Sequence, residues 1–460
     1  MEVYSSLLFI YGFLPVSLLL FYITPKKLRE MMLLFLSAAF CCLLSLYFLI
    51  FIVAFAAVNY ILMHLISRSR RSEKLAAVPL TVGIILDLVA ILAFRTQFFT
   101  WLHRMIRAPE GFYPVGISFF ALGAIGTLID VYKGRIKADR NMVRFALYIM
   151  FFPRLLMGPL LRYKVFTNIL DNRSENLSGM GVGMTIFVKG LAKKVIAADN
   201  LYMLYAAAGS SDVGEISAVT AWLGAVAYIL CLYFELSGFA DMGTGTAYLF
   251  GLKFPQSFNY PLFSIRLKYF AARWQSQVTQ WLRRYVTKPI YGVCRKRWLR
   301  EAVFIIGWGL FGFWYTVDLG GVVWGILIGA AVIIESRLLR KKIMNFTGMI
   351  YTFFTVVICG VFLSGDSLGS SVRYLFAMVG GNGILADSDS FYLIKTYIVL
   401  LLVTMYASTD LFRNLMTRSG KNRIKAAIMA VSPVLVLAVL VLCTAFISYG
   451  GSSHMILMKL

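Results

Sequence analysis

The chain has 460 residues, of which 60% are hydrophobic and only 14% are charged, and its mean hydropathy is +0.78. Soluble domains carry about 25% charged residues, so this composition excludes an ordinary soluble protein and predicts an all-α polytopic integral membrane protein. The net charge of +24 gathers in the loops between apolar stretches, which favours contact with the lipid bilayer and its anionic headgroups and argues against nucleic acid.

The N-terminal third is a series of apolar stretches, each approaching the length that a helix needs to cross a hydrocarbon core of ~30 Å. The first is expected to be a retained helix and not a removed signal peptide. Basic loops follow the first, third and fifth stretches, so the positive-inside rule predicts that the N-terminus lies outside. The expected spans are 6–23, 31–47, 48–66, 76–94 and 112–131.

From about residue 145 the apolar stretches become short, because Pro, Gly and charged residues interrupt them at 145–163, 187–200 and 233–251. Interrupted segments at membrane depth are tolerated only inside the protein or along a wet cavity. This predicts a core chamber, with 151–163 and 237–251 away from lipid, and at least ten spanning or re-entrant helices. Cleaner spans resume at 348–364, 391–408 and 426–449.

We therefore expect one membrane domain over 1–460. It would consist of N-terminal spanning helices (1–140), a core chamber (141–335) and C-terminal spanning helices (336–460). The six cysteines have no CxxC spacing, and His64, His103 and His454 are far apart in the sequence. Neither pattern fits a metal site, so no metal and no bound cofactor are predicted.

Five blocks in order carry a resemblance to a known family. They are 116–134 (GISFF leading to IDVYKG), 151–159 (FFPRLLMGP), 193–200 (KKVIAADN), 233–242 (YFELSGFADM) and 254–289. Together they resemble the bacterial membrane-bound O-acyltransferase (MBOAT) family, of the alginate O-acetyltransferase and teichoic-acid D-alanyl transferase type. The resemblance covers about 116–330. It implies a helical bundle around a central chamber with re-entrant segments.

The family's two functional histidines fall on positions that carry other residues here. The segment 258–275, FNYPLFSIRLKYFAARWQ, ends in Gln275 where the family has its first histidine, and Tyr315 in GFWYT stands in place of the second. Histidine can take and give a proton near neutrality. Gln275 cannot take one, and the reference pKa of a tyrosine is about 10. Losing general-base catalysis typically costs ~10²–10⁴-fold in rate.

The resemblance also implies roles for other residues. Asp241 joins Gln275 and Tyr315 as a catalytic candidate, and we expect Gln275 and Tyr315 to point into one shared polar cavity. The residues implied in a substrate tunnel are Trp274, Asn259, Ser237, Gly238, Glu235, Trp314 and Arg273. The residues implied in shaping the chamber are Pro153, Gly158 and Pro159.

Several of these residues have a second interpretation. Asp241 either caps a half-helix that starts near Gly238 or marks a polar pathway in the membrane. Lys193 and Lys194 either snorkel to the interface or form a basic mouth for a phosphorylated donor. Arg154 is expected to meet headgroups or carboxylates. The aromatic and basic stretch 266–300 is either an interfacial anchor or part of a cytoplasmic funnel.

Three functions remain open. The first is a pseudoenzyme that retains the scaffold and binds a donor, a lipid or a partner. The second is an active O-acyltransferase with a rewired site that uses Glu235 or Asp241, and the third is a lipid or small-molecule conduit. The family alone implies an acyl donor (acyl-CoA or an acyl-carrier-protein thioester) on the cytoplasmic side, and an extracytoplasmic transferase or polymer. It also implies the bacterial cytoplasmic (inner) membrane.

Overall fold

The computed structural model describes residues 5–95, 114–155, 157–209, 213–338, 345–411 and 422–449. Within these ranges the chain forms helices and no β-strand, as the composition predicts. His103 and His454 lie outside the described residues. The chain divides into two compact units, Met1–Gly190 with Phe239–Gln256, and Leu191–Gly238 with Ser257–Leu460. That all 460 residues form one domain stays a prediction.

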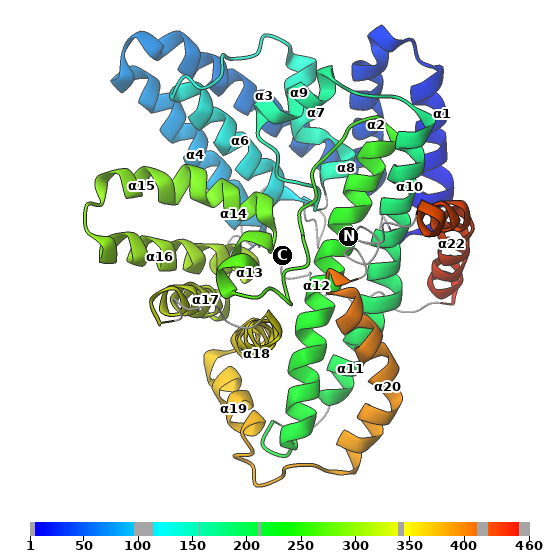
Figure 1. Ribbon diagram of the computed structural model, residues 1–460. Helices are drawn as coiled ribbons and strands as arrows, with labels where there is room; N and C mark the ends of the chain where they lie inside the picture. The colour runs from blue at the N-terminus through cyan, green and yellow to red at the C-terminus, as the bar shows by residue number, and fades with distance from the viewer. Residues whose placement is uncertain are drawn as a thin grey trace. The chain divides into compact units, whose positions relative to one another are not determined.

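The first unit contains the N-terminal helices. In Figure 1 the helices α3, α4 and α6 lie together as a bundle. The helices are η2 (Leu8–Phe13), α1 (Leu14–Ile23), η3 (Lys26–Leu28), α2 (Arg29–Leu44), α3 (Leu46–Arg68), η4 (Ser69–Arg71), α4 (Glu73–Arg95), α6 (Ile117–Tyr132), α7 (Met142–Met150), α8 (Phe152–Leu155), α9 (Tyr163–Asp171) and most of α10 (Leu177–Ala192).

The second unit contains the remaining helices, and α12 (Ala218–Leu249) begins in this unit and ends in the first. In Figure 1 helices α15 and α16 run side by side, and α17 follows them. The helices are η6 (Lys193–Ala198), α11 (Asp199–Ala208), α13 (Leu267–Arg273), α14 (Ser276–Leu282), η7 (Arg283–Thr287), α15 (Lys288–Val293), α16 (Arg297–Thr316), α17 (Leu319–Leu338), α18 (Asn345–Ser364), α19 (Leu368–Met378), α20 (Ser388–Ala407) and α22 (Asn422–Ser448).

Seven of the described helices are long and apolar enough to cross a membrane, namely α3, α4, α12, α17, α18, α20 and α22. The protein is therefore a multi-pass integral membrane protein. The expected spans 48–66, 76–94, 348–364, 391–408 and 426–449 match five of these helices. The expected spans 6–23 and 112–131 match the shorter apolar helices Leu8–Ile23 and Ile117–Tyr132, and the expected span 31–47 matches α2.

The interruption predicted within 233–251 is wrong, because these residues, up to Leu249, belong to the single 32-residue helix α12. Glycines in this stretch serve close packing and do not break the helix. A Cβ on Gly243 would lie 2.4 Å from the carbonyl oxygen of Pro153, and one on Gly245 would lie 2.4 Å from the amide nitrogen of Phe187. Asp241 lies inside the helix, so the interpretation as an N-cap of a half-helix is also wrong.

The interruption predicted within 151–163 is confirmed. Helix α7 ends at Met150, the short α8 follows, and the described residues 157–162 before α9 are non-helical. Arg154 does not meet headgroups or carboxylates as expected. It is buried, donates a hydrogen bond of 2.8 Å to the carbonyl of Tyr148, and lies 4.1 Å from the centre of that ring. The described residues of 151–163 are buried except Arg162, and 237–251 are buried or nearly so, as predicted for segments away from lipid.

Helices α16 and α17 form a close crossing built from glycines. A Cβ on Gly312 would lie 1.8 Å from the carbonyl oxygen of Gly321, and one on Gly325 would lie 2.0 Å from that of Trp308. Small residues let helix backbones approach in this way in membrane proteins. The crossing fixes the end of α16, which carries Tyr315.

The start of α12 is tied to residues far ahead in the sequence. The amides of Ala218 and Val219 donate to the carbonyls of Ile384 and Leu385 at 2.9 and 3.1 Å. Asp387, which caps α20, accepts a hydrogen bond of 3.0 Å from the hydroxyl of Ser217. The N-terminal donors that a helix leaves unpaired thus find partners in the loop before α20.

Candidate functional site

The segment that carries the family resemblance folds back on itself around Trp274. The amide of Ser276 donates to the carbonyl of Ser257 at 2.8 Å, and the amide of Asn259 donates to the carbonyl of Arg273 at 3.3 Å. These two bonds hold the stretch 257–259 against the junction between α13 and α14. They place the Trp274 ring 5.5 Å from Phe258.

Gln275 occupies that junction in a left-handed backbone conformation, with φ +39° and ψ 56°. Such a conformation is uncommon for a residue other than glycine and persists only where the surroundings impose it. The carbonyl of Gln275 accepts hydrogen bonds from the amides of Val278 and Thr279 and so begins α14. Its side chain is buried, and its Oε1 has no hydrogen-bond partner among the described residues.

Trp274 connects this junction to α16. Its indole Nε1 donates a hydrogen bond of 3.1 Å to the hydroxyl of Tyr315, and both side chains are almost fully buried. The Tyr315 ring also contacts Phe311 and Trp324, with centroids 5.2 and 5.5 Å away. The two motif segments therefore meet, as the resemblance implies. That Gln275 and Tyr315 line one shared polar cavity stays a prediction.

Burial controls the protonation of Tyr315. Helix α16 is outside the seven spanning candidates. Burial raises the pKa of the Tyr315 phenol above its ordinary value, and the hydrogen bond from Trp274 lowers it by less. The phenol is therefore neutral near pH 7. It accepts the hydrogen bond from Trp274 and is not a base at this pH.

Removing the Tyr315 hydroxyl should destabilise the protein. In Tyr315→Phe the buried indole N–H of Trp274 loses its acceptor, and such a buried donor costs about 1–3 kcal/mol. We expect a lower thermal unfolding midpoint in detergent, followed by intrinsic fluorescence. Tyr392→Phe, which removes an exposed hydroxyl on α20, is the control. Equal midpoints for the two variants would show that the bond does not stabilise the fold.

A buried ionic cluster lies elsewhere in the second unit, between η6 and α12. The Nζ of Lys194 lies 2.6 Å from Oδ1 of Asp199 and 3.4 Å from Oε1 of Glu235. Lys194 and Glu235 are completely buried. Burial lowers the pKa of Lys194, but the two carboxylates outweigh it and raise the pKa on balance. Lys194 is thus neither an interfacial snorkel nor part of a basic mouth, and both interpretations are wrong for it.

The local helix geometry explains how Lys194 enters the interior. It lies in a π-helical turn, η6, and such turns redirect side chains and occur often at functional sites. Cys231, one helical turn before Glu235, donates to the carbonyl of Ala198 at 3.1 Å. The same face of α12 therefore packs on η6 and supplies the carboxylate. The sequence identifies Lys194 as a candidate residue but does not indicate that Asp199 and Glu235 pair with it.

The other predicted site residues are distributed over both units. In the second unit Ser237 and Gly238 are buried on α12, Arg273 is half-buried and Asn259 is exposed. The ring of Trp314 lies 5.7 Å from that of Tyr315. In the first unit Asp241 is buried, and so are the residues expected to shape the chamber, Pro153, Gly158 and Pro159.

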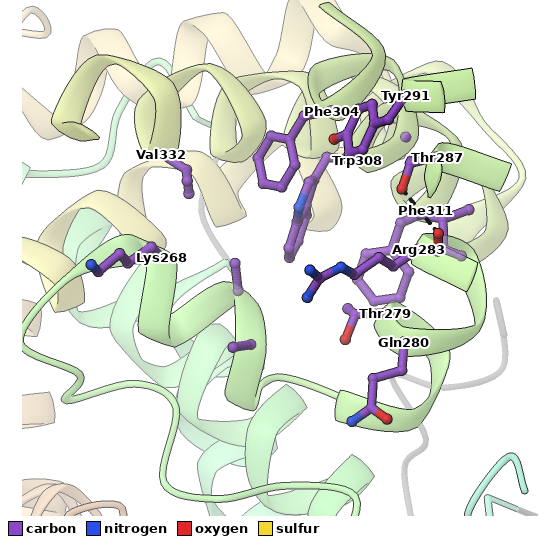
Figure 2. Close-up of a pocket in the computed structure, with 14 residues that line it drawn as sticks. Lys268, Thr279, Gln280, Arg283, Thr287, Tyr291, Phe304, Trp308, Phe311 and Val332 are labelled. Atoms are coloured by element: carbon purple, nitrogen blue, oxygen red, sulfur yellow. Dashed lines mark hydrogen bonds between the residues drawn. The ribbon is translucent and has the colours of Figure 1, made fainter. Parts of the chain in front are cut away.

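A pocket of about 660 Å³ lies among α13, α14, η7, α15, α16 and α17. Figure 2 shows the guanidinium of Arg283 directed into it, opposite the ring of Trp308. Phe311 lines the pocket and also contacts Tyr315, so one aromatic ring separates the pocket from the Trp274–Tyr315 pair. The sequence contains the signal for this pocket in the spacing of Phe304, Trp308 and Phe311 on one helix face.

The described residues contain no group of three or more His, Cys, Asp or Glu side chains that could hold a metal ion. His64 lies in α3 of the first unit, where its Nδ1 is 3.1 Å from the carbonyl oxygen of Tyr60. All six cysteines are free thiols.

Comparison with known proteins gives consistent results. Residues 131–363 match the MBOAT, membrane-bound O-acyltransferase family. The chain is 30% identical to the probable alginate O-acetylase AlgI of Azotobacter vinelandii, over 87% of this chain and 83% of that protein. It is 26% identical to the peptidoglycan O-acetyltransferase of Helicobacter pylori (98% and 90%), and 25% identical to the teichoic acid D-alanyltransferase of Bacillus subtilis (46% and 56%).

Proposed function

Because the chain belongs to the membrane-bound O-acyltransferase family, we propose that it serves the acylation of an exported cell-surface polymer. In this proposal it acts as a pseudoenzyme that binds a donor, a lipid or a partner protein and does not itself transfer the acyl group by histidine chemistry. The relatives support the process, since their names refer to alginate, peptidoglycan and teichoic acid. The membrane would be the bacterial cytoplasmic membrane.

The observation that carries this proposal is the hydrogen bond from Trp274 to Tyr315. At the two positions where the family resemblance places histidines, this chain has an amide and a buried phenol. The phenol already accepts the indole N–H, and burial raises its pKa. Neither group takes a proton near pH 7, whereas acyl transfer to a hydroxyl needs a base in that range.

Donor binding does not need that base. An acyl donor such as acyl-CoA or an acyl-carrier-protein thioester needs an apolar passage and a cationic rim, and this chain has many basic residues in its loops. The proposed partners are therefore a carrier protein on the cytoplasmic side and an extracytoplasmic transferase or polymer. If the protein binds the donor without transferring its acyl group, its role would be to assemble or regulate the acylation machinery.

The competing proposal is an active enzyme with a rewired base. Glu235 and Asp241 are its two candidates, and the carboxylate of Glu235 faces the ammonium of Lys194 inside the protein. A carboxylate beside a buried ammonium is occupied as the counter-charge of that cation and is poorly placed to serve as a base. This arrangement favours a structural role for Glu235.

Gln275→Ala should leave the cellular phenotype almost unchanged. The measurement is the amount of ester-linked acyl groups on the cell envelope after gene deletion and complementation with wild type or Gln275→Ala. Because the Gln275 Oε1 has no partner among the described residues, truncation removes no hydrogen bond of that atom. Gly158→Leu is the positive control for loss, since a Cβ there would lie 2.4 Å from the Cα of Arg154.

The double variant Gln275→His/Tyr315→His tests the same proposal by introducing the two histidines that this chain lacks. Wild-type purified protein should release acyl groups at background, and the double variant shows whether two histidines suffice to restore transfer. Robust turnover by the wild type that collapses in Gln275→Ala would refute the pseudoenzyme proposal and support the rewired enzyme.

A further inference from the structure

The pocket beside α16 contains a cation that no described carboxylate neutralises. Arg283 extends its guanidinium into the pocket (Figure 2). The neighbouring acids are engaged elsewhere in the second unit. Glu301 pairs with Arg297 and Arg337, and Glu335 accepts a hydrogen bond of 2.7 Å from the amide of Leu267. An arginine in this position is suited to an anionic ligand, because its planar donors match a phosphate.

The opposite wall of the pocket is apolar. Phe304 and Trp308 of α16 supply aromatic rings there and Val332 of α17 adds an aliphatic side chain, while the ring of Phe311 lies beside Arg283. The Trp308 ring is held by Phe311 and Trp324, with centroids 5.2 and 6.1 Å away. The pocket therefore combines one cationic side with one rigid hydrophobic side. Its ligand should carry an anion next to an apolar chain.

The surrounding surface indicates where such a ligand comes from. The stretch 266–300 has ten basic residues and no acidic residue. Around these cations the apolar side chains of Ile290, Val293 and Trp298 are exposed. Exposed apolar and basic side chains on neighbouring helices are typical of segments that lie in the headgroup region of a bilayer. This surface therefore favours membrane lipid as the source of a ligand for the pocket.

We infer that this pocket binds one anionic phospholipid, with its phosphate on Arg283 and the start of an acyl chain against Trp308 and Phe311. A volume of about 660 Å³ suits part of a lipid, within the ~300–1,000 Å³ of small-molecule sites. A nucleotide thioester carries several phosphate groups. Among the described residues, the charged side chains that line the pocket are Arg283 and Lys268, which favours a single phosphate. The inference does not depend on whether the protein transfers acyl groups.

The test is native mass spectrometry of the purified full chain in detergent with added phosphatidylglycerol or phosphatidylcholine. We expect preferential retention of phosphatidylglycerol, reduced about tenfold in Arg283→Gln because a charge-assisted hydrogen bond is lost. Lys288→Gln is the matched control, since Lys288 is an exposed cation of the same segment that does not line the pocket. Inorganic phosphate and coenzyme A are added as competitors.

A second variant tests the apolar part of the site. Ala272 lines the pocket and is exposed, so Ala272→Trp should fill the space and displace the lipid while the unfolding midpoint stays near that of wild type. The inference is overturned if phosphatidylcholine binds as well as phosphatidylglycerol, or if Arg283→Gln retains as much lipid as Lys288→Gln. It is also overturned if Ala272→Trp retains wild-type binding, or if coenzyme A displaces the lipid and itself depends on Arg283.

Discussion

Lys194→Met should destabilise the protein by about 3–5 kcal/mol, the cost of removing one partner from a buried ion pair. The side chain of Lys194 is completely buried and faces Asp199 and Glu235 at 2.6 and 3.4 Å. Methionine fills a similar volume but removes the ammonium that Asp199 and Glu235 face. We expect a large fall in the thermal unfolding midpoint in detergent and loss of the monodisperse peak in size-exclusion chromatography.

Two further variants separate charge burial from general damage. Lys193→Met changes the neighbouring lysine, which is only partly buried and lies 6.0 Å from the Tyr233 ring, so it should destabilise the protein less than Lys194→Met. Lys194→Met/Glu235→Gln removes both charges and should recover part of the loss. A Lys194→Met protein as stable as Lys193→Met would mean that the cluster contributes nothing to the fold.

Gly312→Leu should prevent α16 and α17 from packing. The added Cβ alone would lie 1.8 Å from the carbonyl oxygen of Gly321, and a backbone atom cannot move aside as a flexible side chain can. Over-packing a well-packed interior costs about 1–3 kcal/mol and sometimes more. Because this clash is with a backbone atom, we expect the loss of folding free energy to reach or exceed the upper end of that range. The expected result is little or no folded protein after extraction, measured by fluorescence-detected size-exclusion chromatography.

Gly292→Leu is the control for this variant. Gly292 lies in α15, is exposed, and has no atom within 4 Å of the position of a Cβ. Leucine favours a helix over glycine by up to about 1 kcal/mol, so the control should be neutral or slightly stabilising. Equal yields for Gly312→Leu and Gly292→Leu would contradict the close crossing.

The helices of the N- and C-terminal parts could be predicted from the sequence because lipid imposes a simple requirement. A helix facing lipid must be apolar over its length, so 48–66 and 391–408 are recognised from composition alone. The family resemblance likewise located the meeting of the two motif segments, since Trp274 contacts Tyr315. Both inferences depend on features that are local in the sequence or carried by a motif.

The interior could not be predicted in the same way. In α12 the glycines at 243 and 245 looked like interruptions, but their meaning depends on the backbones that pack against them. The charge of Lys194 suggested a surface position, because its partners Asp199 and Glu235 are assigned only by the fold. Arg154 likewise finds its acceptor in a backbone carbonyl and an aromatic face. In each case the residue type allows more than one structural role, and the tertiary contacts decide which role the residue has.

The loop before α20 has a consequence for biosynthesis. The first two amides of α12 donate hydrogen bonds to the carbonyls of Ile384 and Leu385, and the hydroxyl of Ser217, just before α12, donates to Asp387, 170 positions further along the chain. At ~5–20 residues per second of translation, these partners leave the ribosome roughly 10–30 s after α12 has emerged. During that interval the N-terminal amides of α12, the longest helix in the described part of the chain, must be satisfied by water, by lipid headgroups or by an insertion chaperone. The start of α12 therefore reaches its final hydrogen bonding only after the loop before α20 has been synthesised.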